Sequence, residues 1–132
     1  MQQTIFQIRN LSVRIRDKTL LEIDRLEIPA GMTVVIGPNG AGKSTLLRAL
    51  IGQIGQGEIT LFDKAAAPQV RAGKVAWVGQ HGRYNMPMTV REYIALASFV
   101  QKGRLNHEWA DELLDYFDLT ALAGHTTRKV SA

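Results

Sequence analysis

The chain has 132 residues, of which 45% are hydrophobic, a formal net charge of +4 and no cysteine. These values are typical of about one globular domain, and they exclude a disordered tail, a disulfide framework and a membrane span of about 18 apolar residues. The first residues hold no charged stretch followed by an apolar one, so we expect no secretion signal and a cytoplasmic protein.

The first half of the chain is predicted to be rich in strands. Apolar residues alternate with polar ones over residues 4–15 and 20–28, which predicts two strands joined by a turn at 16–18. Further strands are expected at residues 33–36, 57–62 and 74–78, with Trp77 in the core. Pro68 predicts a loop over residues 65–73.

The second half is predicted to be helical. Thr89 and Glu92 have the spacing of a capping box, which predicts a helix from there to about Val100. Asn106 can cap a second helix. The apolar residues of that helix recur at i, i+3, i+4 and i+7 and are Ala110, Leu113, Leu114 and Phe117.

Residues 37–45 read GPNGAGKST and satisfy the phosphate-loop pattern G-x-x-x-x-G-K-S/T. The β-branched run at 33–36 precedes this loop, and a strong helix-forming stretch at 46–51 follows it before Gly52. Strand, glycine loop and helix form the context that supports such a motif. The alternative is a glycine-rich turn that caps an ordinary helix.

The residue types of this phosphate loop favour binding of a magnesium-bound polyphosphate. Gly40 and Gly42 have no Cβ, so the main-chain N–H groups can approach the phosphates closely at a helix N-terminus. Lys43 should reach the β- and γ-phosphates, Ser44 offers a hydroxyl to Mg²⁺, and Thr45 can bond on the α-phosphate side. The expected binding residues are Gly37, Pro38, Asn39, Gly40, Ala41, Gly42, Lys43, Ser44 and Thr45.

Four stretches together resemble the N-terminal half of the ATP-binding domain of ABC transporters. They are Asn10–Val13, Ile28–Gly31, the run GPNGAGKSTLLRAL, and VAWVGQ at 75–80 followed by MTVRE at 88–92. Many NTPases share the phosphate loop. A glutamine loop such as the one that contains Gln80, at this distance along the chain from the phosphate loop, is similar to that of ABC proteins.

The resemblance implies an α/β fold of the P-loop NTPase class, of ABC ATPase type and incomplete. Residues 1–87 would hold an antiparallel β subdomain with the phosphate-loop strand and helix, and residues 88–132 the start of the helical subdomain. Gln80 is implied to contact Mg²⁺ and the region of the attacking water. Lys43 and Gln80 are thus the catalytic candidates, Ser44 and Gln80 the metal ligands, and ATP and Mg²⁺ the cofactors.

The implied partners are transmembrane permease subunits and a second ATP-binding subunit, at the inner face of the cell membrane. The run at 86–90 resembles importers of metals or metal chelates. One alternative is a non-catalytic fragment that pairs with a full ABC subunit, and another is a different P-loop NTPase. Nucleic acid is not expected, because the basic residues are scattered along the chain.

Some positions depart from the family pattern. Ile15 stands where an aromatic residue usually stacks on adenine, which leaves the base selectivity open. Residues 128–132 resemble the lead-in to the signature motif, and the 132 residues hold no signature, catalytic glutamate strand or switch histidine. Asp63 follows an apolar run like a magnesium-binding aspartate, but Lys64 follows it, so we expect no catalytic role. The chain alone is expected to have little or no ATPase activity.

The resemblance also predicts low stability. The strand at 33–36 would lack the neighbours that it has in the family, and roughly 500 Å² of unburied apolar surface would cost about 12 kcal/mol. A whole domain is stable by about 5–15 kcal/mol. We expect the isolated chain to be marginally stable or oligomeric, and a monomer with cooperative urea unfolding of normal stability would contradict this.

Overall fold

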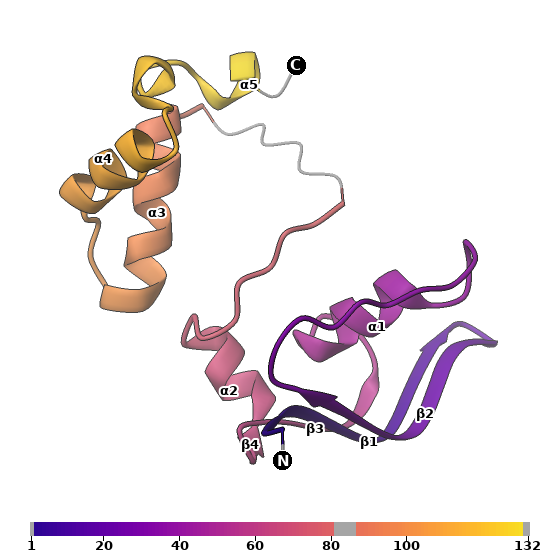
Figure 1. Cartoon of the computed structure of the whole chain (residues 1–132). Helices are drawn as coiled ribbons and strands as arrows, with labels where there is room; N and C mark the ends of the chain where they lie inside the picture. Colours follow the sequence, from indigo (N-terminus) through magenta and orange to yellow (C-terminus); the bar gives the residue numbers. More distant parts are fainter. Residues whose placement is uncertain (1, 81–86, 131–132) are drawn as a thin grey trace. The chain divides into compact units, whose positions relative to one another are not determined.

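A computed structural model describes residues 2–80 and 87–130 (Figure 1). The chain divides into two compact units, Met1–Ala76 and Trp77–Ala132. The boundary between residues 87 and 88, which the resemblance implies for the two subdomains, stays a prediction. The phosphate loop belongs to the first unit, and Gln80 belongs to the second.

The first unit is built on a four-stranded antiparallel sheet with the order β2-β1-β3-β4. Its strands are β1 (Thr4–Ile15), β2 (Lys18–Pro29), β3 (Gln56–Leu61) and β4 (Lys64–Ala65). The strands predicted at 4–15, 20–28 and 57–62 are thereby confirmed. The turn between β1 and β2 is confirmed too, with Arg16 in the left-handed region at φ 53°.

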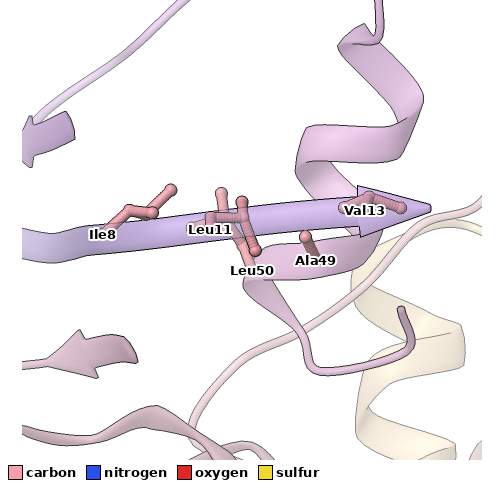
Figure 2. Packing of buried hydrophobic residues seen from close by; sticks show 5 residues of the cluster. All are labelled: Ile8, Leu11, Val13, Ala49 and Leu50. Carbon is pink, nitrogen blue, oxygen red and sulfur yellow. The ribbon is translucent and has the colours of Figure 1, made fainter. Parts of the chain in front are cut away.

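Helix α1 (Lys43–Leu50) packs against β1 and closes the core of this unit. Figure 2 shows the five buried side chains of this cluster, which are Ile8, Leu11 and Val13 from the strand and Ala49 and Leu50 from the helix. An irregularity at Asn10, with φ 50°, lets Ile8 and Leu11 face the same side although they are three positions apart. The last turn of α1 is therefore anchored on the middle of β1.

Two predicted strands are absent from the described residues. Residues 33–36 form no strand, and Val34 and Ile36 are 68% and 88% exposed. Residues 74–78 form none either, and Trp77 is 41% exposed, so its predicted place in a strand core is wrong. A strand forms only when a neighbour takes up its main-chain hydrogen bonds, and no described strand pairs with either run.

The loop predicted at 65–73 is also wrong, because this stretch contains β4 and helix α2 (Ala66–Arg71). Pro68 lies in the first turn of α2, where a missing N–H costs no intrahelical bond. The Gln69 side chain ties the helix to the sheet by donating to the Leu61 carbonyl at 2.6 Å.

The second unit is helical, as predicted. It contains α3 (Val90–Lys102), α4 (His107–Tyr116), the 3₁₀ turn η1 (Thr120–Leu122) and α5 (Thr127–Val130). The capping box of Thr89 and Glu92 is confirmed, and Asn106 caps α4 by accepting from the Trp109 N–H at 3.0 Å. Within the described parts of the chain, no helix has the length and apolar character needed to cross a bilayer.

The start of α3 is held by the segment that follows η1. The Val90 N–H donates to the His125 carbonyl at 2.9 Å, and the Arg91 N–H donates to the Ala123 carbonyl at 3.1 Å. These are two of the four N–H groups that a helix leaves without intrahelical partners, and the capping box takes up a third. The segment and the helix thus stabilise each other.

Helices α3 and α4 are joined by polar contacts. The Ser98 hydroxyl, in a side chain only 2% exposed, donates to the Ala95 carbonyl at 2.6 Å and accepts from the Asn106 N–H at 2.8 Å. Arg91 donates to both oxygens of Asp111 at 2.6 and 2.8 Å. This hydrogen-bonded pairing lowers the pKa of Asp111.

The capping box predicts an acid-sensitive second unit. The Thr89 N–H donates to Glu92 at 2.7 Å, and this bond holds the pKa of the Glu92 carboxyl below its ordinary value. A lowered pKa stabilises the fold above the ordinary pKa of glutamate, and this stabilisation is lost as the pH falls through the lowered value. Thermal unfolding measured from about pH 7 to about pH 3 tests this. We expect the melting temperature of Glu92→Gln to fall less with acid than that of the wild type, because the variant has no carboxyl to protonate at this position.

Glu112→Gln, which changes an exposed carboxyl on α4, serves as the matched control and should keep the wild-type pH dependence. Identical pH profiles for the wild-type chain and Glu92→Gln would contradict the assignment.

Candidate phosphate-binding site

The phosphate loop curls tightly through two glycines. Gly40 and Gly42 have φ values of 85° and 100°, in the left-handed region that favours glycine. A Cβ added at Gly40 would meet no atom within 4 Å, so this main chain is open to a ligand. The Ala41 N–H donates to the Pro38 carbonyl at 3.1 Å and closes the turn. The conformation fits the predicted close approach of phosphate to main chain.

The main-chain N–H groups at the start of α1 are available to a ligand. Gly42 is the N-cap, no side chain caps the helix, and its first turn holds no acidic residue. Helix geometry leaves the first N–H groups, here those of Lys43, Ser44 and Thr45, without intrahelical acceptors. Together with the helix dipole, these groups form a ready site for an anion.

Lys43 lies across the phosphate loop. Its ammonium group donates to the carbonyls of Gly37 and Pro38, the second at 2.8 Å. An ammonium group has three N–H donors, so these two bonds leave one for a phosphate oxygen. The side chain therefore stiffens the loop and also adds a positive charge beside the helix N-terminus.

The hydroxyl groups of the first turn fit the magnesium that accompanies a triphosphate. Ser44 is exposed and Thr45 is half-buried, one residue further along α1. Within residues 2–80 and 87–130, no group of three or more His, Asp or Glu could hold a metal ion by itself. A cation here would depend on hydroxyl and phosphate oxygens, which is how Mg²⁺ commonly binds.

The structure adds a neighbour of the loop that the sequence did not indicate. A Cβ built on Gly42 would lie 3.3 Å from the Leu21 side chain and 3.7 Å from the Leu20 carbonyl oxygen, both in β2. The start of α1 therefore packs against the hairpin of β1 and β2. No sequence signal reports this contact, because its partners belong to different elements.

The other candidate residues lie elsewhere. Gln80 is exposed in the second unit, and its predicted contact with Mg²⁺ stays a prediction. Asp63 lies in the turn between β3 and β4, where it accepts a hydrogen bond from Gln7 at 3.1 Å. The structure thus brings the nine predicted loop residues together around the start of α1 and gives Asp63 a structural partner.

A groove of about 560 Å³ lies between the end of α1, β3 and the start of α2. Its walls include Leu50, Ile54 and Ile59, and none of its lining residues belongs to the phosphate loop. The candidate site is therefore the open surface at the start of α1 rather than this groove.

The family follows from comparison with known proteins. The ABC transporter family model matches residues 21–132, which include the phosphate loop and Gln80. The chain belongs to the ABC transporter family. This result confirms the resemblance inferred from the motifs and excludes a P-loop NTPase of another family.

Curated relatives are ATP-binding proteins of import or transport systems. The chain is 36% identical over 117 residues to the hemin import ATP-binding protein HmuV of Bradyrhizobium diazoefficiens, covering 84% of the chain and 44% of the relative. It is 30% identical over 132 residues to the manganese transport system ATP-binding protein MntB of Listeria monocytogenes, covering 94% and 54%. The chain therefore spans about half the length of these relatives.

Solved structures of ABC proteins share the fold. An ATP-binding subunit of an ABC transporter matches with a TM-score of 0.67 at 22% identity, covering 97% of this chain and 58% of its own. A putative metal-chelate type ABC transporter matches with a TM-score of 0.61 at 24% identity, covering 94% and 48%. The fold is thus a part of the ABC ATPase fold, as predicted.

Two glycines with similar backbones allow a test of the phosphate loop. Gly42 and Gly31 have φ values of 100° and 108°, so alanine at either position should cost about 1 kcal/mol of stability. Only Gly42 lies at the helix start and against Leu21. We expect Gly42→Ala to weaken binding of Mg-ATP about tenfold in calorimetry because it displaces the phosphate-binding amides.

Gly31→Ala is the matched control, because a Cβ there meets no atom within 4 Å, and its affinity for Mg-ATP should be that of the wild type. Equal losses of affinity in the two variants would show that backbone strain alone explains the effect.

Proposed function

We propose that this chain binds Mg-ATP as part of the ATP-binding subunit of an ABC importer. The observation that carries the proposal is the uncapped start of α1, where main-chain N–H groups and the Lys43 ammonium converge on an open surface. A triphosphate is the ligand whose charge and oxygen atoms match this set of donors.

The roles of individual residues follow from their chemistry. The amides of Gly40 and of Gly42 to Thr45 would bind phosphate oxygens, and Lys43 would neutralise charge on the β- and γ-phosphates. Ser44 would hold Mg²⁺ through its hydroxyl oxygen. Gln80 would be a second oxygen ligand and would contact the region of the attacking water. Bound Mg²⁺ would supply neutralisation of the charge that develops on the transferred phosphoryl group.

The transported substrate is proposed from the substrates that the relatives' names give. Those named above serve hemin and manganese, and a further relative, 34% identical over 138 residues, is the zinc import ATP-binding protein ZnuC of Halorhodospira halophila. We infer that the whole protein powers import of a metal or metal chelate. Its partners would be permease subunits and a second ATP-binding subunit, at the inner face of the cell membrane.

A second candidate function is nucleotide-dependent pairing with a full ABC subunit, without turnover by this chain. The exposed apolar residues before the phosphate loop favour it, because Met32, Val34 and Ile36 offer an unpaired apolar stretch. Co-purification with permease subunits, rather than with an ATP-binding subunit alone, would favour the first function over this one.

Lys43→Ala tests the nucleotide site. We expect it to weaken Mg-ATP binding by about tenfold or more, because the variant loses a charge-assisted contact to the phosphates. Phosphate release should stay at background in both proteins, since the 132 residues hold no credible base for water. Calorimetry and a phosphate-release assay measure the two quantities.

Lys64→Ala, which changes an exposed lysine in β4, is the control and should bind like the wild type. Lys43-dependent turnover would contradict the expected lack of hydrolysis, and equal affinities in Lys43→Ala and the wild type would contradict the site itself.

A further inference from the structure

The N–H groups proposed to bind phosphate lie in the first turn of α1, and the neighbour of that turn is a leucine of β2. A Cβ built on Gly42, the N-cap of the helix, would lie 3.3 Å from Cδ1 of Leu21 and 3.7 Å from the Leu20 carbonyl oxygen. The shorter contact is tight for two carbon atoms, whose optimal separation is about 3.5–4.0 Å. Glycine therefore lets the main chain of the N-cap lie directly against Leu21.

The hydrogen bonds of the phosphate loop hold the loop to itself. The Ala41 N–H donates to the Pro38 carbonyl at 3.1 Å, and the Lys43 ammonium donates to the carbonyls of Gly37 and Pro38. These bonds define the shape of the loop but join it to no strand. The place of the loop on the β1–β2 hairpin therefore depends on side-chain packing.

Leu21 is itself held by the core of the first unit. It pairs with Val13 across the hairpin, and Val13 is 1% exposed in the buried cluster that also contains Ala49 (Figure 2). Leu21 is half-buried and packs against this cluster. Its side chain contacts both the core and the start of α1, so it can fix the position of Gly42 relative to the sheet.

We propose that Leu21 is a positioning residue of the phosphate site. Its side chain sets the place of the Gly42 main chain, and thereby the direction of the N–H groups that follow in α1. A smaller side chain at this position would leave a cavity into which the N-cap can shift. Hydrogen bonds weaken steeply when their geometry departs from the preferred one, so the shift lowers the affinity for a triphosphate. The inference rests on the proposed nucleotide function and adds a residue that acts through the main chain of the loop, without contact to the ligand.

Leu26 provides the matched control, because it shares the residue type, strand and burial of Leu21 but lies far from the loop. It is half-buried on β2, packs against the same core cluster and pairs with the buried Ile8. Five positions separate the two leucines, which corresponds to about 16 Å along a strand. Both Leu21→Ala and Leu26→Ala should lower the melting temperature, and only Leu21→Ala should also lower the affinity for nucleotide.

Calorimetry with Mg-ATP on the 132-residue chain tests the proposal. We expect Leu21→Ala to bind about tenfold more weakly than the wild type, which is the loss of roughly one hydrogen bond to a charged group. Leu26→Ala should bind within about twofold of the wild type, and Leu21→Met, which keeps the side-chain volume, within about threefold. Circular dichroism verifies folding. If the alanine variants do not fold, Leu21→Val should bind about threefold more weakly than Leu26→Val, since both leave smaller cavities.

A double variant tests the contact itself. Leu21→Ala would leave room for a Cβ at position 42, so Gly42→Ala should cost less affinity in that background than in the wild type. We expect the added loss to be at most about threefold, compared with about tenfold for Gly42→Ala alone.

The outcomes separate this inference from the function on which it rests. If the wild-type chain does not bind Mg-ATP, the proposed nucleotide function fails. If it binds and Leu21→Ala and Leu26→Ala have equal affinities, the function stands and the positioning role is overturned. Full losses from both substitutions in the double variant, or an affinity of Leu21→Met as low as that of Leu21→Ala, would also overturn the positioning role.

Discussion

The position of the phosphate loop depends on the packing of the last turn of α1 against the middle of β1. Ala49 and Leu50 fill the space over Leu11 and Val13, so the helix axis is fixed at its C-terminal end. At the other end, Gly42 rests on the side chain of Leu21. The β1–β2 hairpin contacts the helix at both ends. The position of its free N–H groups is therefore defined, even though the residues before the loop form no strand.

The second unit combines polar contacts at helix ends with a small buried apolar group, Ala95, Ala110 and Leu114. Most of the N–H groups that a helix leaves unpaired at its start find acceptors at the start of α3, in the capping box and in the segment after η1. The buried Ser98 hydroxyl then joins α3 to the residues that lead into α4. Few side chains of this unit are buried, and the large apolar residues Phe99 and Phe117 are exposed.

The exposed apolar residues before the phosphate loop and the open anion site lie next to each other in the chain. Val34 and Ile36 belong to a run with the composition of a buried strand, yet no described strand pairs with it. The helix after the loop forms nonetheless, because its hydrogen bonds are internal and its apolar side rests on the sheet that is present. A site made from a helix start can therefore exist beside a strand that has not formed.

The sequence by itself determined most features that depend on near neighbours in the chain, although it did not indicate helix α2. The phosphate loop, its left-handed glycines, the β1–β2 hairpin, the capping box and the Asn106 cap follow from local spacing and backbone preference, and the motifs were sufficient to indicate the family. Only the tertiary structure decided that no described strand pairs with residues 33–36 or 74–78, that Trp77 is partly exposed and that Gly42 lies against Leu21. Those features depend on hydrogen-bond partners and packing surfaces distant in the chain, and the pattern of a single segment does not encode them.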